Sequence, residues 1–175
     1  MKKGMLYAVF VIGFLFFPHS SRAQEGGSIT AGLGLPELLN VGLRVQFTQT
    51  ELGVAVGVDP WSEDESLALS GAFYYHFGGK SEYTSLRPWY GKAGLTYLRN
   101  ENEWTRNTTF FLVPAVGREF NFNSHFGIAL EAGILIVLSD HEKTLRKDPD
   151  SWFDLDLDFS GIILPSGAIN FYYRF

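Results

Sequence analysis

The chain has 175 residues, a formal net charge of −5, no cysteine, 19 glycines and 16% aromatic residues. An acidic chain argues against a nucleic-acid partner, which favours a basic surface. The lack of cysteine excludes disulfides, a thiolate nucleophile and a Cys-ligated zinc site, so a domain of this size needs another source of stability.

The N-terminal segment has the pattern of a secretory signal peptide. Two lysines precede an apolar stretch at residues 4–17, and a small-residue cleavage site follows at 21–23. The apolar stretch is shorter than the roughly 20 residues of a membrane-spanning helix. We therefore predict a signal peptide at 1–23 and one domain at 24–175, which keeps 11 basic and 19 acidic residues, a charge of 11 − 19 = −8.

Apolar side chains then recur at every second position, which indicates β-strands. In the clearest early example Leu67, Leu69 and Phe73 alternate with small or polar residues. The expected turns at 48–50 and 78–86 lie at one end of the strands, and the connection at 59–65 at the other. The first five predicted strands cover residues 28–35, 39–47, 51–58, 66–77 and 89–98.

The second half of the chain continues the pattern. Strands are expected at 108–120, at 126–138 and in a last segment that ends at Phe175, with connections at 99–107, 121–124 and 139–160. The total of about eight strands is even, as is usual for single-chain outer-membrane barrels.

The two faces of these strands differ in chemistry. One carries a continuous set of bulky apolar side chains, and the other carries glycine, alanine and mid-strand charges. A soluble sandwich or a lipocalin-like barrel also alternates, but the small residues would leave voids in a packed core. The pattern therefore predicts an all-β, eight-stranded antiparallel transmembrane barrel with its bulky face in lipid and its small, polar face around a narrow lumen.

The C-terminal sequence "FYYRF" carries a resemblance. Phe175, with Tyr173 and Phe171 two and four residues before it, resembles the C-terminal assembly signal of Gram-negative outer-membrane barrel proteins. The chain resembles the small eight-stranded barrels of the outer membrane protein A and X type. The resemblance implies recognition by the barrel assembly machinery and a monomer in the cell outer membrane, in contact with its lipids and lipopolysaccharide and without a cofactor. It names an architecture and no activity.

Charged residues of both signs are expected to meet inside the barrel. An eight-stranded lumen is just wide enough for side chains to fill, which favours a plug of ion pairs over a gated, narrow channel. Farther along the lumen the inward side chains are expected to be apolar: Leu98, Val113, Leu135, Val137, Ile162 and Leu164. They could hold a hydrophobic ligand. A shift of one residue at a bulge would instead turn them toward the lipid. The predicted charge network comprises Arg44, Lys92, Glu119, Glu131 and Arg174, with Asn170 and Tyr172 beside it.

Two further motifs suggest chemistry only weakly. Asp154, Asp156 and Asp158 match the start of a calcium loop, but Phe159 replaces its glycine and Pro165 its glutamate. That loop is excluded, no metal site is assigned, and loose divalent binding stays open. Ser139-Asp140-His141 contains hydrolase residue types, although neighbours in sequence rarely adopt catalytic geometry.

These observations lead to one expected role and two alternatives. We expect a non-catalytic structural or surface-interaction protein that contacts its partners through Trp61, Trp104 and Trp152 of the acidic outer loops. The alternatives are a narrow channel or hydrophobic-ligand transporter, and a lipid-modifying barrel enzyme around His141.

Overall fold

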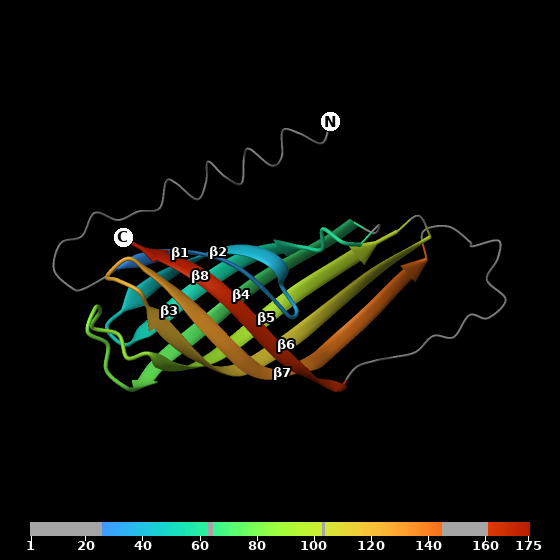
Figure 1. The fold of residues 1–175 in the computed structure, drawn as a ribbon. Helices are drawn as coiled ribbons and strands as arrows, with labels where there is room; N and C mark the ends of the chain where they lie inside the picture. Colours follow the sequence, from blue (N-terminus) through green and yellow to red (C-terminus); the bar gives the residue numbers. More distant parts are fainter. Residues whose placement is uncertain (1–25, 63–64, 103, 145–160) are drawn as a thin grey trace.

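The computed structural model describes residues 26–62, 65–102, 104–144 and 161–175, and the expected signal peptide lies outside them. Eight antiparallel strands form a closed barrel in which β1 also pairs with β8, which confirms the predicted all-β, eight-stranded antiparallel barrel (Figure 1). Among the described residues no helix is long and apolar enough to cross a membrane. The strands are β1 (Gly27–Gly34), β2 (Leu38–Phe47), β3 (Thr50–Val58), β4 (Glu65–Gly78), β5 (Trp89–Glu101), β6 (Thr105–Asn121), β7 (Phe126–Thr144) and β8 (Ile163–Arg174).

The barrel has two ends, which we name by the chain. At the near end Gly27 meets Phe175 through a backbone hydrogen bond of 3.0 Å, and the turns after β2, β4 and β6 lie there as well. At the far end lie the last residues of β1, β3, β5 and β7 (Figure 1).

The predicted far-end connections at 99–107 and 139–160 are wrong in their bounds. β5 runs to Glu101, β6 begins at Thr105 and β7 continues to Thr144. These extensions pair in register, with Arg99 opposite Thr108 and Asn107 opposite Glu142. They carry polar side chains in place of an apolar alternating face, so the period that reveals a half-buried strand is absent from them.

The strands differ in length around the barrel. β1 to β3 have 8 to 10 residues, whereas β4 to β7 have 13 to 19. The hairpin of β1 and β2 therefore turns well before the tips of β5 and β6 (Figure 1). Beyond that turn the wall consists of the longer strands, and Ile162, just before β8, and Leu164, near its start, are exposed. Neither residue joins the buried apolar cluster, although Leu164 lies opposite Leu135 in the register of β7 and β8.

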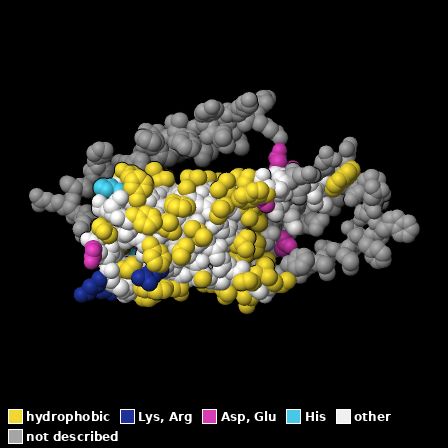
Figure 2. All heavy atoms as spheres, viewed as in Figure 1, with side chains coloured by type: hydrophobic (Ala, Val, Ile, Leu, Met, Phe, Trp, Pro, Cys, Tyr) yellow, Lys and Arg dark blue, Asp and Glu magenta, His cyan; other side chains and the backbone are white. Residues whose placement is uncertain are grey.

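The side chains divide as the alternation predicted. Hydrophobic groups spread over the visible wall of the barrel, and charged groups gather toward its ends (Figure 2). The exposed exterior set includes Leu43, Val54, Val56, Leu69, Leu95, Val116, Leu130, Ile169 and Phe171.

A long turn caps the near end of the lumen. Residues 79–88 join β4 to β5, and Leu86 within this turn is only 1% exposed. Gln49 fastens the turn by donating to Ser85 O at 2.7 Å and accepting from Arg87 N at 3.1 Å. With the 2.6 Å contact between His76 Nδ1 and the Arg87 backbone oxygen, these bonds hold the turn against the near end of the lumen.

Candidate functional site

The structure places all five charged side chains of the predicted lumen network inside the barrel. Each comes from a different strand, and each is at most 9% exposed. They form two groups along the lumen and not a single row. The five are Arg44 on β2, Lys92 on β5, Glu119 on β6, Glu131 on β7 and Arg174 on β8.

Glu131 is the centre of the first group. Its carboxylate accepts hydrogen bonds from Lys92 Nζ at 2.9 Å, Tyr90 Oη at 2.9 Å and Arg44 Nη2 at 3.4 Å. The Arg44 guanidinium also lies 4.1 Å from the centre of the Tyr74 ring, a cation–π contact. Three donors from two strands, β2 and β5, thus reach one buried carboxylate on β7, the arrangement that a buried charge requires.

Glycine makes this crowding feasible. Gly117 lies opposite Glu131 in the register of β6 and β7, and the Tyr90 ring occupies the space that a Cβ at this position would need. Any larger residue at 117 would displace the Tyr90 hydroxyl from the Glu131 carboxylate. The inward small residues of the sequence therefore serve to admit large side chains from other strands.

Glu119 and Arg174 form the second group near the capped end. Arg174 Nη2 donates to Glu119 Oε2 at 2.5 Å, and Arg174 Nη1 donates to Asn121 Oδ1 at 2.9 Å. The Tyr172 hydroxyl donates to the same Asn121 oxygen at 2.7 Å. Asn170, also expected in the lumen, is buried beside the first group and lines the cavity described below.

The network includes three titratable residues that the sequence reasoning did not assign to it. Glu51 Oε2 lies 3.7 Å from Arg44 Nη1 and 3.3 Å from His76 Nε2, and Glu37 Oε1 lies 3.7 Å from Lys92 Nζ. Glu51 shares the parity of the inward Gly53 and Ala55, so alternation contained a usable signal. Glu37 follows no such rule because it lies in the turn before β2.

The buried charges do not balance without a histidine. Four carboxylates of the described residues lie in the lumen, Glu37, Glu51, Glu119 and Glu131, each at most 8% exposed. Three permanently charged cations face them: Arg44, Lys92 and Arg174. With neutral His76 this set has a charge of 3 − 4 = −1, and a proton on His76, a proton on one carboxylate or a bound cation would neutralise it.

The lumen is filled at this height. A cavity of about 20 Å³ lies beside Arg44 and Lys92, which is room for about one water molecule. Its walls include Thr30, Glu37, Asn40, Ser70, Tyr74 and Asn170.

An apolar cluster fills the lumen toward the far end. Phe111, Val113, Leu135 and Val137 are buried against one another, and Leu98 packs against them. Four of the six predicted apolar residues thus lie here, with Phe111 in addition. The side chains contact each other directly, as in a packed core.

The predicted catalytic residue types are not brought together. Ser139, Asp140 and His141 follow one another in β7 opposite Phe110, Thr109 and Thr108. Alternation directs Asp140 to the side of the strand away from its two neighbours, and Asp140 Oδ1 accepts from Thr109 Oγ1 at 2.8 Å.

Several other predicted features lie at the surface or outside the described residues. Trp61 is 72% exposed and Trp104 is half-buried, whereas Trp152 and the acidic Asp154, Asp156 and Asp158 lie outside the described residues. Phe171, Tyr173 and Phe175, the proposed assembly signal, are exposed on the exterior of β8 and the near rim, with Tyr173 4.8 Å from the Phe126 ring.

A small ion-pair cluster holds the hairpin of β5 and β6 beyond the apolar wall. Glu101 accepts from Arg106 Nε and Nη2, both at 3.0 Å, and pairs with Arg99. Hydrogen bonds from Arg106 and Arg99 lower the pKa of Glu101 to about 2.

Comparison of the chain with protein-family models, with curated proteins and with solved structures found no match in any of the three. The functional argument therefore depends on the geometry of the barrel.

Proposed function

We propose that the protein is an outer-membrane β-barrel with a plugged lumen, and that its role is structural or surface interaction. The observation that carries the proposal is the inversion of polarity. Bulky apolar side chains cover the exterior, while charged side chains are buried in ion pairs within the lumen. A water-soluble protein has no reason to bury its charges and expose its large apolar residues, whereas a barrel in lipid requires both.

The aromatic residues support a membrane position. Phe47, Tyr75, Trp89, Phe126 and Tyr173 lie exposed at strand ends near the capped rim. Tyr97 and Phe110 form an edge-on pair, 5.2 Å between centroids, toward the other end. Two aromatic girdles are typical of barrels that span a membrane. By analogy with such barrels, the capped near end with its three turns would face the periplasm.

Among the described residues of β6, Arg118 is the only cation on the exterior at the height of the near aromatic girdle. Its guanidinium lies 5.3 Å from the Trp89 ring and 4.9 Å from the Phe120 ring. An arginine at this height can reach headgroup phosphates while its stem stays in the apolar region. Its position supports placing the near rim at a membrane surface.

The contents of the lumen favour a plug over a channel. Each buried cation of the network lies within 4 Å of a carboxylate, and the cavity beside Arg44 and Lys92 admits about one water. The turn at 79–88 covers the near mouth, and the apolar cluster fills the opposite half. Ion passage would require several of these contacts to break together.

The test is single-channel recording of the purified protein in planar lipid bilayers. We expect wild type to insert without discrete conductance steps. Lys92→Ala and Glu131→Ala open space at the centre of the network, so they are compared with wild type. Glu82→Ala, at an exposed glutamate of the near-end turn, is the matched control.

The outcomes separate the proposed role from its rival. Discrete conductance in wild type, altered by Lys92→Ala and unaltered by Glu82→Ala, would make the charge network a pore constriction and the protein a channel. A silent wild type directs the search for partners to the far-end surface, where Trp61 is 72% exposed beside Asp59 and Glu65.

A further inference from the structure

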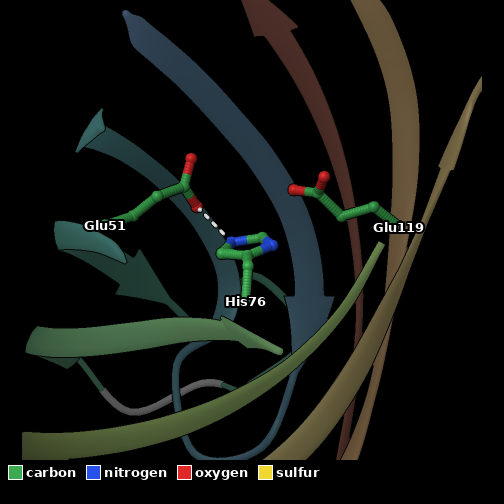
Figure 3. A group of neighbouring side chains, drawn as sticks. All are labelled: Glu51, His76 and Glu119. Carbon is green, nitrogen blue, oxygen red and sulfur yellow. Dashed lines mark hydrogen bonds and ion pairs between the residues drawn. The ribbon is translucent and has the colours of Figure 1, made fainter. Parts of the chain in front are cut away.

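We propose that Glu51, His76 and Glu119 form a binding site for a divalent transition-metal ion, with Zn²⁺ as the first candidate, beneath the near-end cap. The three residues come from β3, β4 and β6, and all are buried. One ligand atom from each lies within 4.8 Å of the other two. The two carboxylates point toward the histidine ring from opposite sides (Figure 3).

The histidine is held in the orientation that metal ligation needs. His76 Nδ1 lies 2.6 Å from the backbone oxygen of Arg87, which can only accept, so this nitrogen carries a hydrogen. The Tyr90 ring lies 5.1 Å from the imidazole, centre to centre, and restricts its rotation. Metal-bound histidines almost always donate their second ring nitrogen to such a carbonyl or carboxylate.

The free nitrogen faces an anion. His76 Nε2 lies 3.3 Å from Glu51 Oε2, and with neutral His76 these two acceptors repel unless a proton or a metal cation is shared between them. Two ligands bound at 2.0–2.1 Å to a tetrahedral zinc ion are themselves about 3.3 Å apart. The observed separation of 3.3 Å therefore fits two ligands on one ion, as it also fits a hydrogen bond from a protonated His76, and the experiment below separates the two.

The charge balance of the lumen leaves place for one more positive charge, which a bound ion or a proton on His76 would supply. With neutral His76 the described buried set has a charge of −1, from four carboxylates and three permanent cations. A divalent ion with one deprotonated water adds a single positive charge and restores neutrality. Three protein ligands and one water are a common zinc coordination.

A donor for the fourth ligand is present. Arg174 Nε is buried and has no hydrogen-bond partner among the described residues, although the same guanidinium binds Glu119. A buried unpaired donor is costly, and a metal-bound water or hydroxide would accept its hydrogen. Arg174 Nε, on the side chain that also binds Glu119, is thus the donor that we assign to a metal-bound water.

The donor set selects the class of metal. One imidazole and two carboxylates suit zinc and its neighbours in the first transition row better than calcium or magnesium, which prefer oxygen ligands alone. Arg44 and Arg174 already bind the two carboxylates, so the ion must share them with guanidinium groups. Because His76 donates to Arg87 of the cap, a bound ion would also fix the 79–88 turn.

The experiment uses the full chain, expressed without a polyhistidine tag, purified in detergent micelles and stripped with a chelator. Co²⁺ is titrated while its visible absorption is recorded, and Zn²⁺ is then added to displace it. We expect one Co²⁺ per chain, the strong bands of four-coordinate cobalt, full displacement by Zn²⁺ and a higher melting temperature with either ion.

Variants locate the site. His76→Gln should abolish the cobalt spectrum, and Glu119→Gln should weaken binding at least about tenfold, because each removes a ligand. His125→Gln, which changes an exposed histidine at the same end of the barrel, is the control and should bind like wild type.

The wild-type titration can overturn the proposal by itself, whatever the folding of the variants. Absence of stoichiometric Co²⁺ binding would sink it, as would binding that persists in folded His76→Gln or disappears in His125→Gln. Nitrogen NMR showing both ring nitrogens of His76 protonated in the presence of excess Zn²⁺ would assign the missing charge to a proton and reject the metal.

Discussion

The two halves of the lumen are filled by different chemistry although the same strands build both. β5 carries Lys92 in the near half and Leu98 in the far half, and β7 carries Glu131 and then Leu135. In the near half eight strands close the circle, so a charge on one strand finds a partner across the barrel. In the far half the short strands have ended, and the inward apolar side chains pack against one another instead.

A narrow barrel can therefore exclude water in two ways, by ion pairing or by apolar packing. Ion pairs are directional, and removing one member leaves an uncompensated buried charge. Apolar packing is non-directional, and removing a side chain leaves a cavity whose cost depends on how far the neighbours relax. Truncations at matched depths therefore test whether the two halves respond differently.

The largest effect is expected for Glu131→Ala. This change leaves Lys92, Arg44 and Tyr90 without their common acceptor, so unfolding free energy should fall by about 3–5 kcal/mol. Urea unfolding in lipid vesicles, followed by tryptophan fluorescence, measures it. The companion Lys92→Met/Glu131→Gln removes one charge of each sign and should lose less than Glu131→Ala. An equal or larger loss in the companion would show that packing, and not charge pairing, stabilises the near half.

A smaller loss is expected for Leu135→Ala in the far half. Truncating this buried leucine removes apolar contacts and leaves no orphan charge, so the loss should be about 2–3 kcal/mol, at the lower end for buried leucines. The same unfolding assay is read at low and high salt, where the loss should not change. A negligible loss would mean that the apolar cluster is loosely packed and has room for a hydrophobic ligand.

The smallest effect is expected at the far rim, with Glu101→Gln. The pKa of Glu101 is lowered from 4.5 to about 2, so its ion pairs stabilise the fold fully above pH 4.5 and this contribution disappears as the pH falls through 2. Wild type should melt slightly above Glu101→Gln at pH 7, and the two should coincide near pH 2. Glu82→Gln, at an exposed near-end glutamate, serves as the control. A difference that persists at pH 2 would contradict the assignment of the low pKa to the arginine contacts.

Alternation was enough to predict the closed barrel and the inward position of the five network charges, because one period governs every strand. It failed where that period carries no apolar signal, as in the polar extensions of β5 to β7. It also failed at Glu37 and in the 79–88 cap, whose inward side chains follow from turn geometry. The grouping of Glu51, His76 and Glu119 required register between strands far apart in sequence, which parity alone does not provide.

The unequal strand lengths have a consequence for how the molecule opens. Beyond Leu138, β7 pairs with β6 and with no other described strand, and the first residues of β4 pair only with β5. The strands there are hydrogen-bonded along one edge only, so their amide hydrogens should exchange with deuterium through local fraying, at opening free energies far below the global value. In the near ring each strand is hydrogen-bonded along both edges, and the pairing of β1 with β8 closes the circle. Amide hydrogens there should exchange only when the whole circle opens. The barrel would thus show two rates of hydrogen exchange, a fast one at its far tips and a slow one at its near end.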